Sequence, residues 1–301
     1  METLILFRPN IREPQILIDS LKRLTNLKRL SLHCVECIND QTLTQILEVI
    51  GNNLISLDLG GYMAIPNRLT DTSIKSISKY CKKLENLCLD LFSATATFDS
   101  LMTLFTIDYS LVVGNNNNKS TEVTDYNCRR SYRLKVVRLS ACRRVSYDLL
   151  MQVCSYCVNL VHLDVSGLTD LIDDSLIEIL STNAPKLTIL DLKACTKLTD
   201  KSICSIAVKC PIQCLVLSGI NNLTDKIIFA IANHLQFSLK EIYLSGCTRI
   251  TSVALRYLAD CCINHLFCEH RVPNLDPNQL MAKNLDTGHF ERVDQINFRN
   301  N

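Results

Sequence analysis

The chain has 301 residues, of which 47% are hydrophobic and 21% are charged, and its formal net charge at pH 7 is +2. A protein that binds nucleic acid through the phosphates usually has a basic excess or a pI above about 9, so a pI of about 7.8 argues against nucleic-acid binding. The apolar content excludes disorder for most of the chain, because burial of that much apolar surface can offset the entropy lost on ordering.

No targeting or membrane-spanning segment is visible in the sequence. The longest apolar run near the start, Leu4 to Phe7, is shorter than the roughly 7 to 15 residues of a signal-peptide core. No run reaches the roughly 18 to 20 consecutive apolar residues of a membrane span. We therefore expect a protein of the cytoplasm, with the nucleus as an alternative, and no membrane partner. Because cytosolic thiols stay reduced, the 16 cysteines are expected to be free.

The first 26 residues precede a repeated pattern and contain apolar residues at helical spacing: Ile16, Leu17, Ile18 and Leu21. A stack of repeats leaves an apolar cross-section open at each end, and this cross-section must be shielded from water. We therefore predict that residues 1–26 form an N-terminal cap over the edge of the first repeat.

From residue 27 onward one pattern recurs: Leu-x-x-Leu-x-Leu, then Cys, Gly or Ile three residues later, and then Leu or Ile followed by Thr-Asp and an apolar segment. Copies begin at Leu27, Leu54, Leu84, Leu134, Leu160, Leu187, Ile212, Leu239 and Ile263. They are 24 to 30 residues apart, except for one interval of 50 residues. Most of the chain is therefore built from one repeated unit.

Each copy predicts a short strand followed by a helix. In one of the clearest copies, Leu190 and Leu192 lie on one side of an alternating segment and Asp191 lies on the other, as in a strand. Ile203 and Ile206 then recur at helical spacing. We predict that these four apolar residues are buried and that Asp191 is exposed. Aspartates ahead of the helices are predicted to be N-caps: Asp40, Asp71, Asp173, Asp200 and Asp225.

The copies must stack, because strands and helices this short cannot bury their apolar faces alone. Their residue types and spacing resemble the cysteine-containing class of leucine-rich repeats over about residues 24–270. Three segments resemble the repeats of F-box leucine-rich proteins and of antagonist-of-mitotic-exit-network proteins: 192–200, 217–219 and 244–251. The resemblance implies an α/β leucine-rich repeat solenoid over residues 27–270, in which about nine parallel strands form a curved inner layer and the helices lie outside.

The same resemblance implies a non-catalytic protein-interaction module. It indicates a substrate-recognition or adaptor protein related to SCF ubiquitin ligase-dependent protein degradation; the alternative is a regulatory or structural scaffold unrelated to ubiquitination. In F-box leucine-rich proteins an F-box precedes the repeats and usually contains a tryptophan. This chain has no tryptophan and only 26 residues before Leu27. We therefore expect no F-box in this chain, and we expect any association with Skp or cullin subunits to be indirect.

Cysteines recur in register with the repeats, which favours a packing role over metal binding. Three follow the strands (Cys142, Cys195, Cys247) and four lie at helix ends (Cys81, Cys157, Cys210, Cys261). Cys262, Cys268 and His270 fall outside this ladder, and zinc binding there is the alternative. Phosphate-binding glycine loops and the common hydrolase and metalloprotease motifs are absent from the sequence. We therefore expect no enzyme activity, no cofactor and no metal.

Two segments interrupt or end the pattern. The interval between Leu84 and Leu134 is about 23 residues longer than one period and includes an asparagine-rich stretch, which predicts a flexible insertion near residues 108–130. The simpler explanation of this insertion is that a surface loop can be lengthened at little entropic cost, and contact with a partner is the alternative. After Cys268 the pattern gives way to prolines and polar residues, so we predict a C-terminal cap and tail over residues 271–301.

Function is expected on the concave face, where residues between the consensus leucines point away from the core. We expect the fold to make no demand for particular residue types at these outward positions. The predicted protein-binding site there consists of Arg138, Asp164, Asp191, Lys193, Val216, Tyr243 and Phe267. Exposed aromatic residues beside charges are typical of binding hot spots, and Tyr243 is the principal anchor. For Phe267, burial under the terminal cap is an equal alternative.

Overall fold

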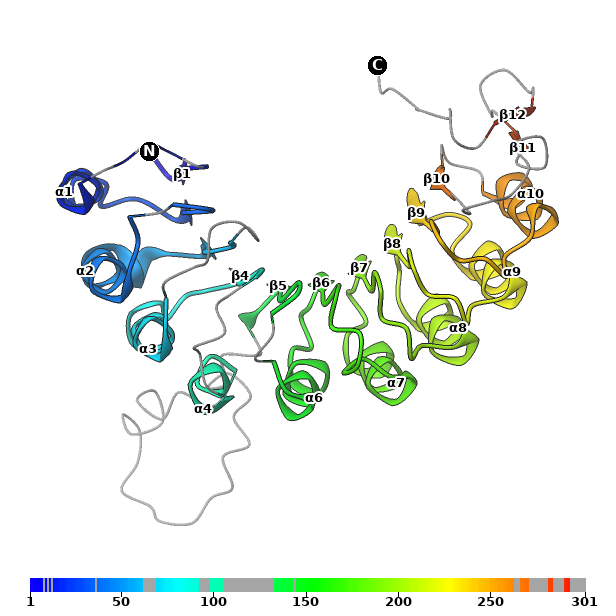
Figure 1. Ribbon diagram of the computed structural model, residues 1–301, viewed down its shortest axis with the longest axis horizontal. Helices are drawn as coiled ribbons and strands as arrows, with labels where there is room; N and C mark the ends of the chain where they lie inside the picture. The colour runs from blue at the N-terminus through cyan, green and yellow to red at the C-terminus, as the bar shows by residue number, and fades with distance from the viewer. Residues whose placement is uncertain are drawn as a thin grey trace, which may run out of the picture. The chain divides into compact units, whose positions relative to one another are not determined.

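The computed structural model describes residues 1–7, 9, 11, 13–35, 37–61, 69–91, 98–105, 133–142, 145–262, 266–270, 281–283 and 290–292. The chain divides into two compact units, Met1–Leu160 and Val161–Asn301. In both units short parallel strands alternate with helices along the chain (Figure 1). The predicted insertion near residues 108–130 lies outside the described residues, as does the predicted C-terminal tail apart from two short strands.

Unit 1 contains five parallel strands that pair in chain order: β1 (Thr3–Ile5), β2 (Arg29–Ser31), β3 (Ser56–Asp58), β4 (Asn86–Cys88) and β5 (Val136–Arg138). Its described helices are α1 (Pro14–Lys22), α2 (Asp40–Ile50), the short 3-10 helix η1 (Gly51–Asn53), α3 (Asp71–Tyr80), α4 (Phe98–Met102) and α6 (Tyr147–Tyr156). Both β1 and α1 lie in the segment predicted to be a cap. In α1, Leu17, Ile18 and Leu21 are buried, whereas Ile16 is 59% exposed.

Unit 2 also contains five parallel strands in chain order: β6 (His162–Asp164), β7 (Ile189–Asp191), β8 (Cys214–Val216), β9 (Glu241–Tyr243) and β10 (Phe267–Glu269). Its helices α7 (Asp174–Asn183), α8 (Asp200–Lys209), α9 (Asp225–His234) and α10 (Ser252–Cys261) pack side by side along the other side of the unit (Figure 1). Two further strands, β11 (Met281–Lys283) and β12 (Phe290–Arg292), form an antiparallel pair. No described helix is long and apolar enough to cross a membrane.

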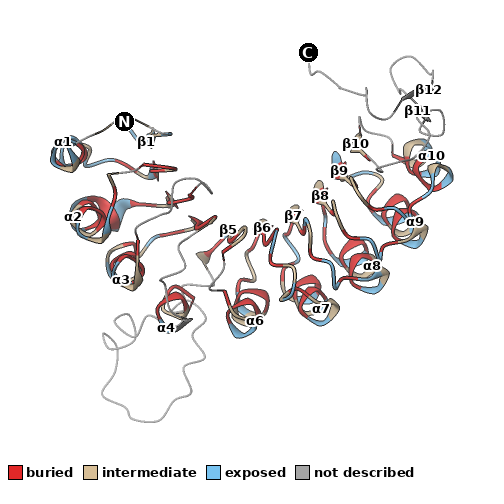
Figure 2. Cartoon of the chain, in the orientation of Figure 1, coloured by how far each residue is buried: buried red, intermediate tan, exposed pale blue. Residues whose placement is uncertain are grey.

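The core of each unit lies between the strand layer and the helix layer. Leu190, Leu192, Ile203 and Ile206 are fully buried, as predicted, and Asp191 is partly exposed. Figure 2 shows buried residues on the facing sides of the strands and helices. Each unit bends toward its strands, because neighbouring strands lie about 4.8 Å apart and packed helices about 8–10 Å apart. These features confirm the α/β leucine-rich repeat solenoid. The described parallel strands, β1–β10, exceed the predicted nine by one because the sequence pattern did not reveal β1.

The helix N-caps differ from the prediction at four of the five aspartates. Asp173 is an N-cap, and its carboxylate accepts a hydrogen bond from the Leu176 amide at 3.0 Å. Four aspartates instead begin their helices, behind an asparagine or threonine that is the cap: Asp40, Asp71, Asp200 and Asp225. Threonine and aspartate are both favourable N-cap residues, so the Thr-Asp sequence alone does not decide between them.

Aspartates at helix starts, including three of the four displaced ones, connect neighbouring repeats. Asp200 Oδ1 accepts a hydrogen bond from the Thr224 amide at 2.8 Å, and Asp200 Oδ2 accepts one from the Thr224 hydroxyl at 2.6 Å. Thr224 is the N-cap of α9, so the carboxylate at the start of one helix positions the cap of the following helix. This contact, the Asp–Thr link, recurs in the pairs Asp40–Thr70, Asp174–Thr199 and Asp225–Thr251.

The last repeat lies two residues away from its predicted register. Strand pairing places Glu269, and not Phe267, opposite Tyr243, while Phe267 lies opposite Glu241. The core position between them is Cys268, which pairs with an isoleucine of β9. A pattern based on leucine at core positions therefore assigned the wrong start to this repeat.

Three residues predicted to lie outside the repeat ladder occupy regular positions within it. Cys262, and not Cys261, is the C-cap of α10, and it takes the buried place of the helix-end cysteines. Cys268 and His270 occupy the two leucine positions of the last strand, and His270 is 2% exposed. Packing in the ladder therefore accounts for the residues that gave rise to the zinc alternative.

One turn residue after the strands adopts a left-handed backbone conformation in several repeats. Gly219 and Gly246 have φ angles of 81° and 82°, which glycine adopts without steric strain. The equivalent residue after β7 is Ala194, with a φ angle of 62°. Its Cβ atom makes this conformation unfavourable by about 1–2 kcal/mol. Backbone geometry therefore explains the recurring glycine of the Leu-Ser-Gly segments.

Candidate interaction face of the strand layer

Outward residues of β6–β10 form rows across unit 2, because paired strands place equivalent residues side by side. The first row consists of His162, Ile189, Cys214, Glu241 and Phe267, and the second of Asp164, Asp191, Val216, Tyr243 and Glu269. A third row follows beyond the strand ends and consists of Ser166, Lys193, Ser218 and Ser245. These three rows are the strand face of unit 2, and the unit bends toward this face.

Six of the seven predicted contact residues lie on the strand face of unit 2. Four are neighbours in the second row: Asp164, Asp191, Val216 and Tyr243. Lys193 is in the third row, and Phe267 is in the first row because of the register shift in the last repeat. Arg138 belongs to β5 of unit 1, so the structure does not assign it to the same face.

Aspartates of the second row satisfy backbone amides at the ends of their strands. Asp191 Oδ1 accepts from the Lys193 amide at 2.9 Å, and Asp164 Oδ1 accepts from the Ser166 amide at 3.0 Å. The Ser166 hydroxyl also donates to Asp164 at 2.7 Å, and Asp164 is only 7% exposed. The expectation that the fold makes no demand at outward positions is therefore wrong for these two residues. An aspartate there completes the hydrogen bonding of the turn.

Two aromatic rings and two carboxylates are grouped at the end of the strand face. The rings of Tyr243 and Phe267 have centroids 5.3 Å apart and an interplanar angle of 50°. The Tyr243 hydroxyl donates to Glu241 Oε2 at 3.1 Å, and the Ser245 hydroxyl donates to Glu269 Oε1 at 3.1 Å. Glu241, Tyr243, Phe267 and Glu269 are termed the aromatic–acidic cluster. The prediction missed Glu241, although its position two residues before Tyr243 places it on the same side of a strand.

Charge on the strand face of unit 2 is mainly negative. Burial and the nearby Glu241 carboxylate raise the pKa of Tyr243 to about 12 and the pKa of Cys214 to about 12, so neither group ionises near neutral pH. Lys193 in the third row is the single lysine in the three rows, and His162 in the first row is the single histidine. Four carboxylates lie in the same rows: Asp164, Asp191, Glu241 and Glu269.

Arg138 forms an ion pair within unit 1. Its guanidinium contacts the carboxylate of Asp90, which is 5% exposed. Asp90 also accepts from the Cys88 thiol at 3.3 Å and from the Ser140 amide at 3.0 Å. The charge of Arg138 is therefore compensated by a buried carboxylate, and the residue has a structural role in its own unit.

Described cysteines are free thiols, and those that follow the strands have the contacts of packing residues. The Cys195 thiol donates to the Val165 carbonyl at 3.6 Å, and the Cys247 thiol donates to the Leu217 carbonyl at 3.2 Å. Burial raises the pKa of Cys195 to about 12 and that of Cys247 to about 11. Within the described ranges, no three His, Cys, Asp or Glu side chains are grouped so that they could hold a metal ion.

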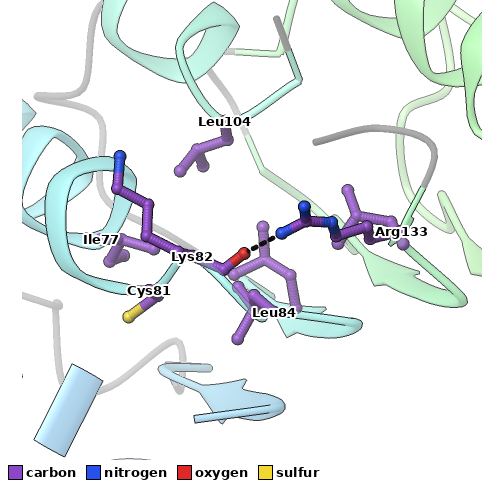
Figure 3. Close-up of a pocket in the computed structure, with 8 residues that line it drawn as sticks. Ile77, Cys81, Lys82, Leu84, Leu104 and Arg133 are labelled. Carbon is purple, nitrogen blue, oxygen red and sulfur yellow. Dashed lines mark hydrogen bonds between the residues drawn. The ribbon is translucent and has the colours of Figure 1, made fainter. Parts of the chain in front are cut away.

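A small cavity lies in unit 1 between the end of α3 and the start of β4 (Figure 3). The lining includes Ile77, Cys81, Lys82, Leu84, Leu104 and Arg133. The Arg133 guanidinium donates to the Lys82 carbonyl at 2.5 Å at the edge of this cavity. Its volume of about 20 Å³ has room for about one water molecule. This cavity is too small for a cofactor or a substrate.

No family model matches the chain. Solved structures that it resembles include a chain of the yeast Rad7 and Elc1 complex, with 16% identity, coverage of 88% of this chain and 79% of that chain, and a TM-score of 0.43. Others are the leucine-rich repeat-containing protein LegL7 from Legionella pneumophila (14% identity, coverage 92% and 93%, TM-score 0.42) and an internalin (inlF) from Listeria monocytogenes (14% identity, coverage 87% and 67%, TM-score 0.37). Likenesses at this level assign no partner and no activity. The alternating strands and helices of the chain itself identify its fold as a leucine-rich repeat solenoid.

Proposed function

We propose that the protein is a non-catalytic interaction module that binds a protein partner through the strand face of unit 2. The observation that carries this proposal is the aromatic–acidic cluster, in which Tyr243 and Phe267 occupy outward positions of the strand layer. An outward ring adds nothing to the core between strands and helices. At an interface, however, it supplies a large contact area with little loss of conformational entropy, and tyrosine is enriched at binding hot spots.

Residues around the cluster match the usual organisation of a protein interface. Val216 lies beside Tyr243 in the second row and extends its apolar centre. Charged and hydroxyl groups surround this centre, with Lys193 exposed in the third row and Asp191 partly exposed in the second. An apolar and aromatic centre with a polar rim is typical of protein–protein interfaces.

The more specific role that we propose is substrate recognition or adaptor function in SCF ubiquitin ligase-dependent protein degradation. Support for this role comes from the likeness of segments 192–200, 217–219 and 244–251 to repeats of F-box leucine-rich proteins. Association with Skp or cullin subunits would then be indirect, through a further protein. A regulatory or structural scaffold unrelated to ubiquitination is the alternative, and it uses the same face.

Site-specific photo-crosslinking in cells tests the proposed face. The full chain carries a photoreactive amino acid either at Val216 on the strand face or at Val208, which is 59% exposed on α8, as the matched control. We expect the reactive group at position 216 to capture a protein that the control does not capture. Capture from position 208 alone would overturn the proposed face. Skp or cullin subunits that co-purify with the captured protein would support the adaptor role, and their absence would favour the scaffold.

A further inference from the structure

We infer that the aromatic–acidic cluster binds the guanidinium group of an arginine in an extended basic segment of the partner protein. This inference rests on the proposed function and adds the chemistry of the partner. It concerns Glu241, Tyr243, Phe267 and Glu269, which lie on the neighbouring strands β9 and β10.

Rings and carboxylates alternate in the cluster. Phe267 lies opposite Glu241, and Glu269 lies opposite Tyr243. The two rings are in contact along the diagonal between these pairs, with a centroid distance of 5.3 Å. Each ring therefore has a carboxylate-bearing residue directly opposite it on the neighbouring strand, whose backbone is roughly 4.8 Å away. The hydrogen bond from the Tyr243 hydroxyl at 3.1 Å holds the Glu241 carboxylate beside the ring.

Arginine matches this combination better than any other side chain. Its planar guanidinium stacks on aromatic rings and donates two parallel hydrogen bonds to a carboxylate. Lysine is a compact, strongly hydrated charge and does not stack in this way. An acidic partner would meet the carboxylates of Glu241 and Glu269 with like charge, which is unfavourable across an interface.

The charge of the whole face favours a basic segment. Its four carboxylates outnumber the single lysine, Lys193, although the complete chain has a formal charge of +2. The negative charge is therefore local, and it opposes nucleic acid and anionic lipid. Asp191 on β7 lies two strand spacings, about 10 Å, from Tyr243 on β9, which is the length of about three residues of extended chain. Two basic residues three positions apart can thus lie above β7 and β9 together.

A fluorescent peptide with two arginines three positions apart in a glycine–serine background is the probe. Its affinity for the full chain is measured by fluorescence anisotropy at about 0.1 M salt, beside versions with lysine or with citrulline, the neutral analogue of arginine. We expect the citrulline peptide to bind at least about tenfold more weakly. The lysine peptide should bind roughly two- to fivefold more weakly, because stacking is lost.

Variants of the protein locate the binding site. Tyr243→Leu and Glu241→Gln should each weaken binding of the arginine peptide roughly two- to fivefold. The matched controls, Tyr257→Leu on α10 and Glu178→Gln on α7, remove the same groups from the helix side and should leave the affinity unchanged. Far-ultraviolet circular dichroism confirms that each variant is folded.

Several results would overturn the inference: no binding of the arginine peptide up to about 1 mM, equal binding of the citrulline peptide, or equal weakening by the helix-side controls. If one of these occurs while the reactive group at Val216 still captures a partner, the arginine site is wrong and the proposed function stands. If Val216 captures no protein, the proposed function itself fails.

Discussion

Removal of the Asp200 carboxylate tests whether the Asp–Thr link stabilises the stack of repeats. Asp200→Ala eliminates two hydrogen bonds to Thr224, at 2.8 Å and 2.6 Å, and the acidic residue in the first turn of α8. A hydrogen bond to a charged group contributes about 1.5–3 kcal/mol, and an acidic residue at a helix start contributes about 0.3–1 kcal/mol. Because Asp200 is partly exposed, these contributions are reduced, and we expect the free energy of unfolding to fall by about 2 kcal/mol.

A double-mutant cycle identifies the origin of this loss. If the link is the main contact of Asp200, the double variant Asp200→Ala/Thr224→Ala loses about 1 kcal/mol less than the sum of the two single variants, because the shared contact is lost only once. Thr251 is bonded to Asp225, so the pair Asp200→Ala/Thr251→Ala is the control and should be additive. Urea unfolding of the full chain, followed by circular dichroism, gives the free energies. Equal coupling in the two pairs would refute the link.

Three further predictions concern stability and the thiols. Ala194→Gly should raise the free energy of unfolding by about 0.5–1 kcal/mol, because relief of left-handed strain exceeds the entropy cost of glycine; a lower urea midpoint would contradict this. Buried thiols such as Cys195 should resist a thiol reagent at pH 8 until the protein is unfolded. A chelator should leave the circular dichroism spectrum unchanged, and stoichiometric zinc in the purified protein would refute this expectation of a metal-free fold. Burial alone would raise the pKa of Asp174, but hydrogen bonds from Ser202 and Thr199 hold this pKa below its ordinary value. The stabilisation of the fold by the ionised Asp174 carboxylate is therefore complete above about pH 4, and it is lost as the pH falls through the lower pKa of the folded state. The difference in urea midpoint between the native chain and Asp174→Asn should therefore be smaller at pH 3 than at pH 6, and a constant difference would argue against the effect.

Repetition made the core predictable from the sequence. Leu190, Leu192 and Ile203 recur at fixed spacing because a strand and a helix of one length must bury the same side in every repeat. The last repeat was placed in the wrong register because its core positions hold Cys268 and His270. Four of the five N-caps were misplaced by one residue, since asparagine, threonine and aspartate are all favourable at this position.

The candidate site was predictable only in part. Alternation along a strand showed which residues point outward, so Val216 and Tyr243 could be identified. Alternation does not show which outward side chains are bonded to their own structure. The bond from the Ser166 amide to Asp164 and the ion pair of Arg138 with Asp90 depend on how turns and neighbouring strands meet in three dimensions.

The central claim is that a protein partner binds to the strand face of unit 2. The most direct measurement is the dissociation constant of the partner captured at Val216, for the native chain, for Tyr243→Ala and for the helix-side control Tyr257→Ala. We predict that Tyr243→Ala weakens binding by at least about 1 kcal/mol, or roughly fivefold, while the control leaves it unchanged. Unchanged binding of Tyr243→Ala together with weakened binding of Tyr257→Ala would place the partner on the helix side and contradict the claim.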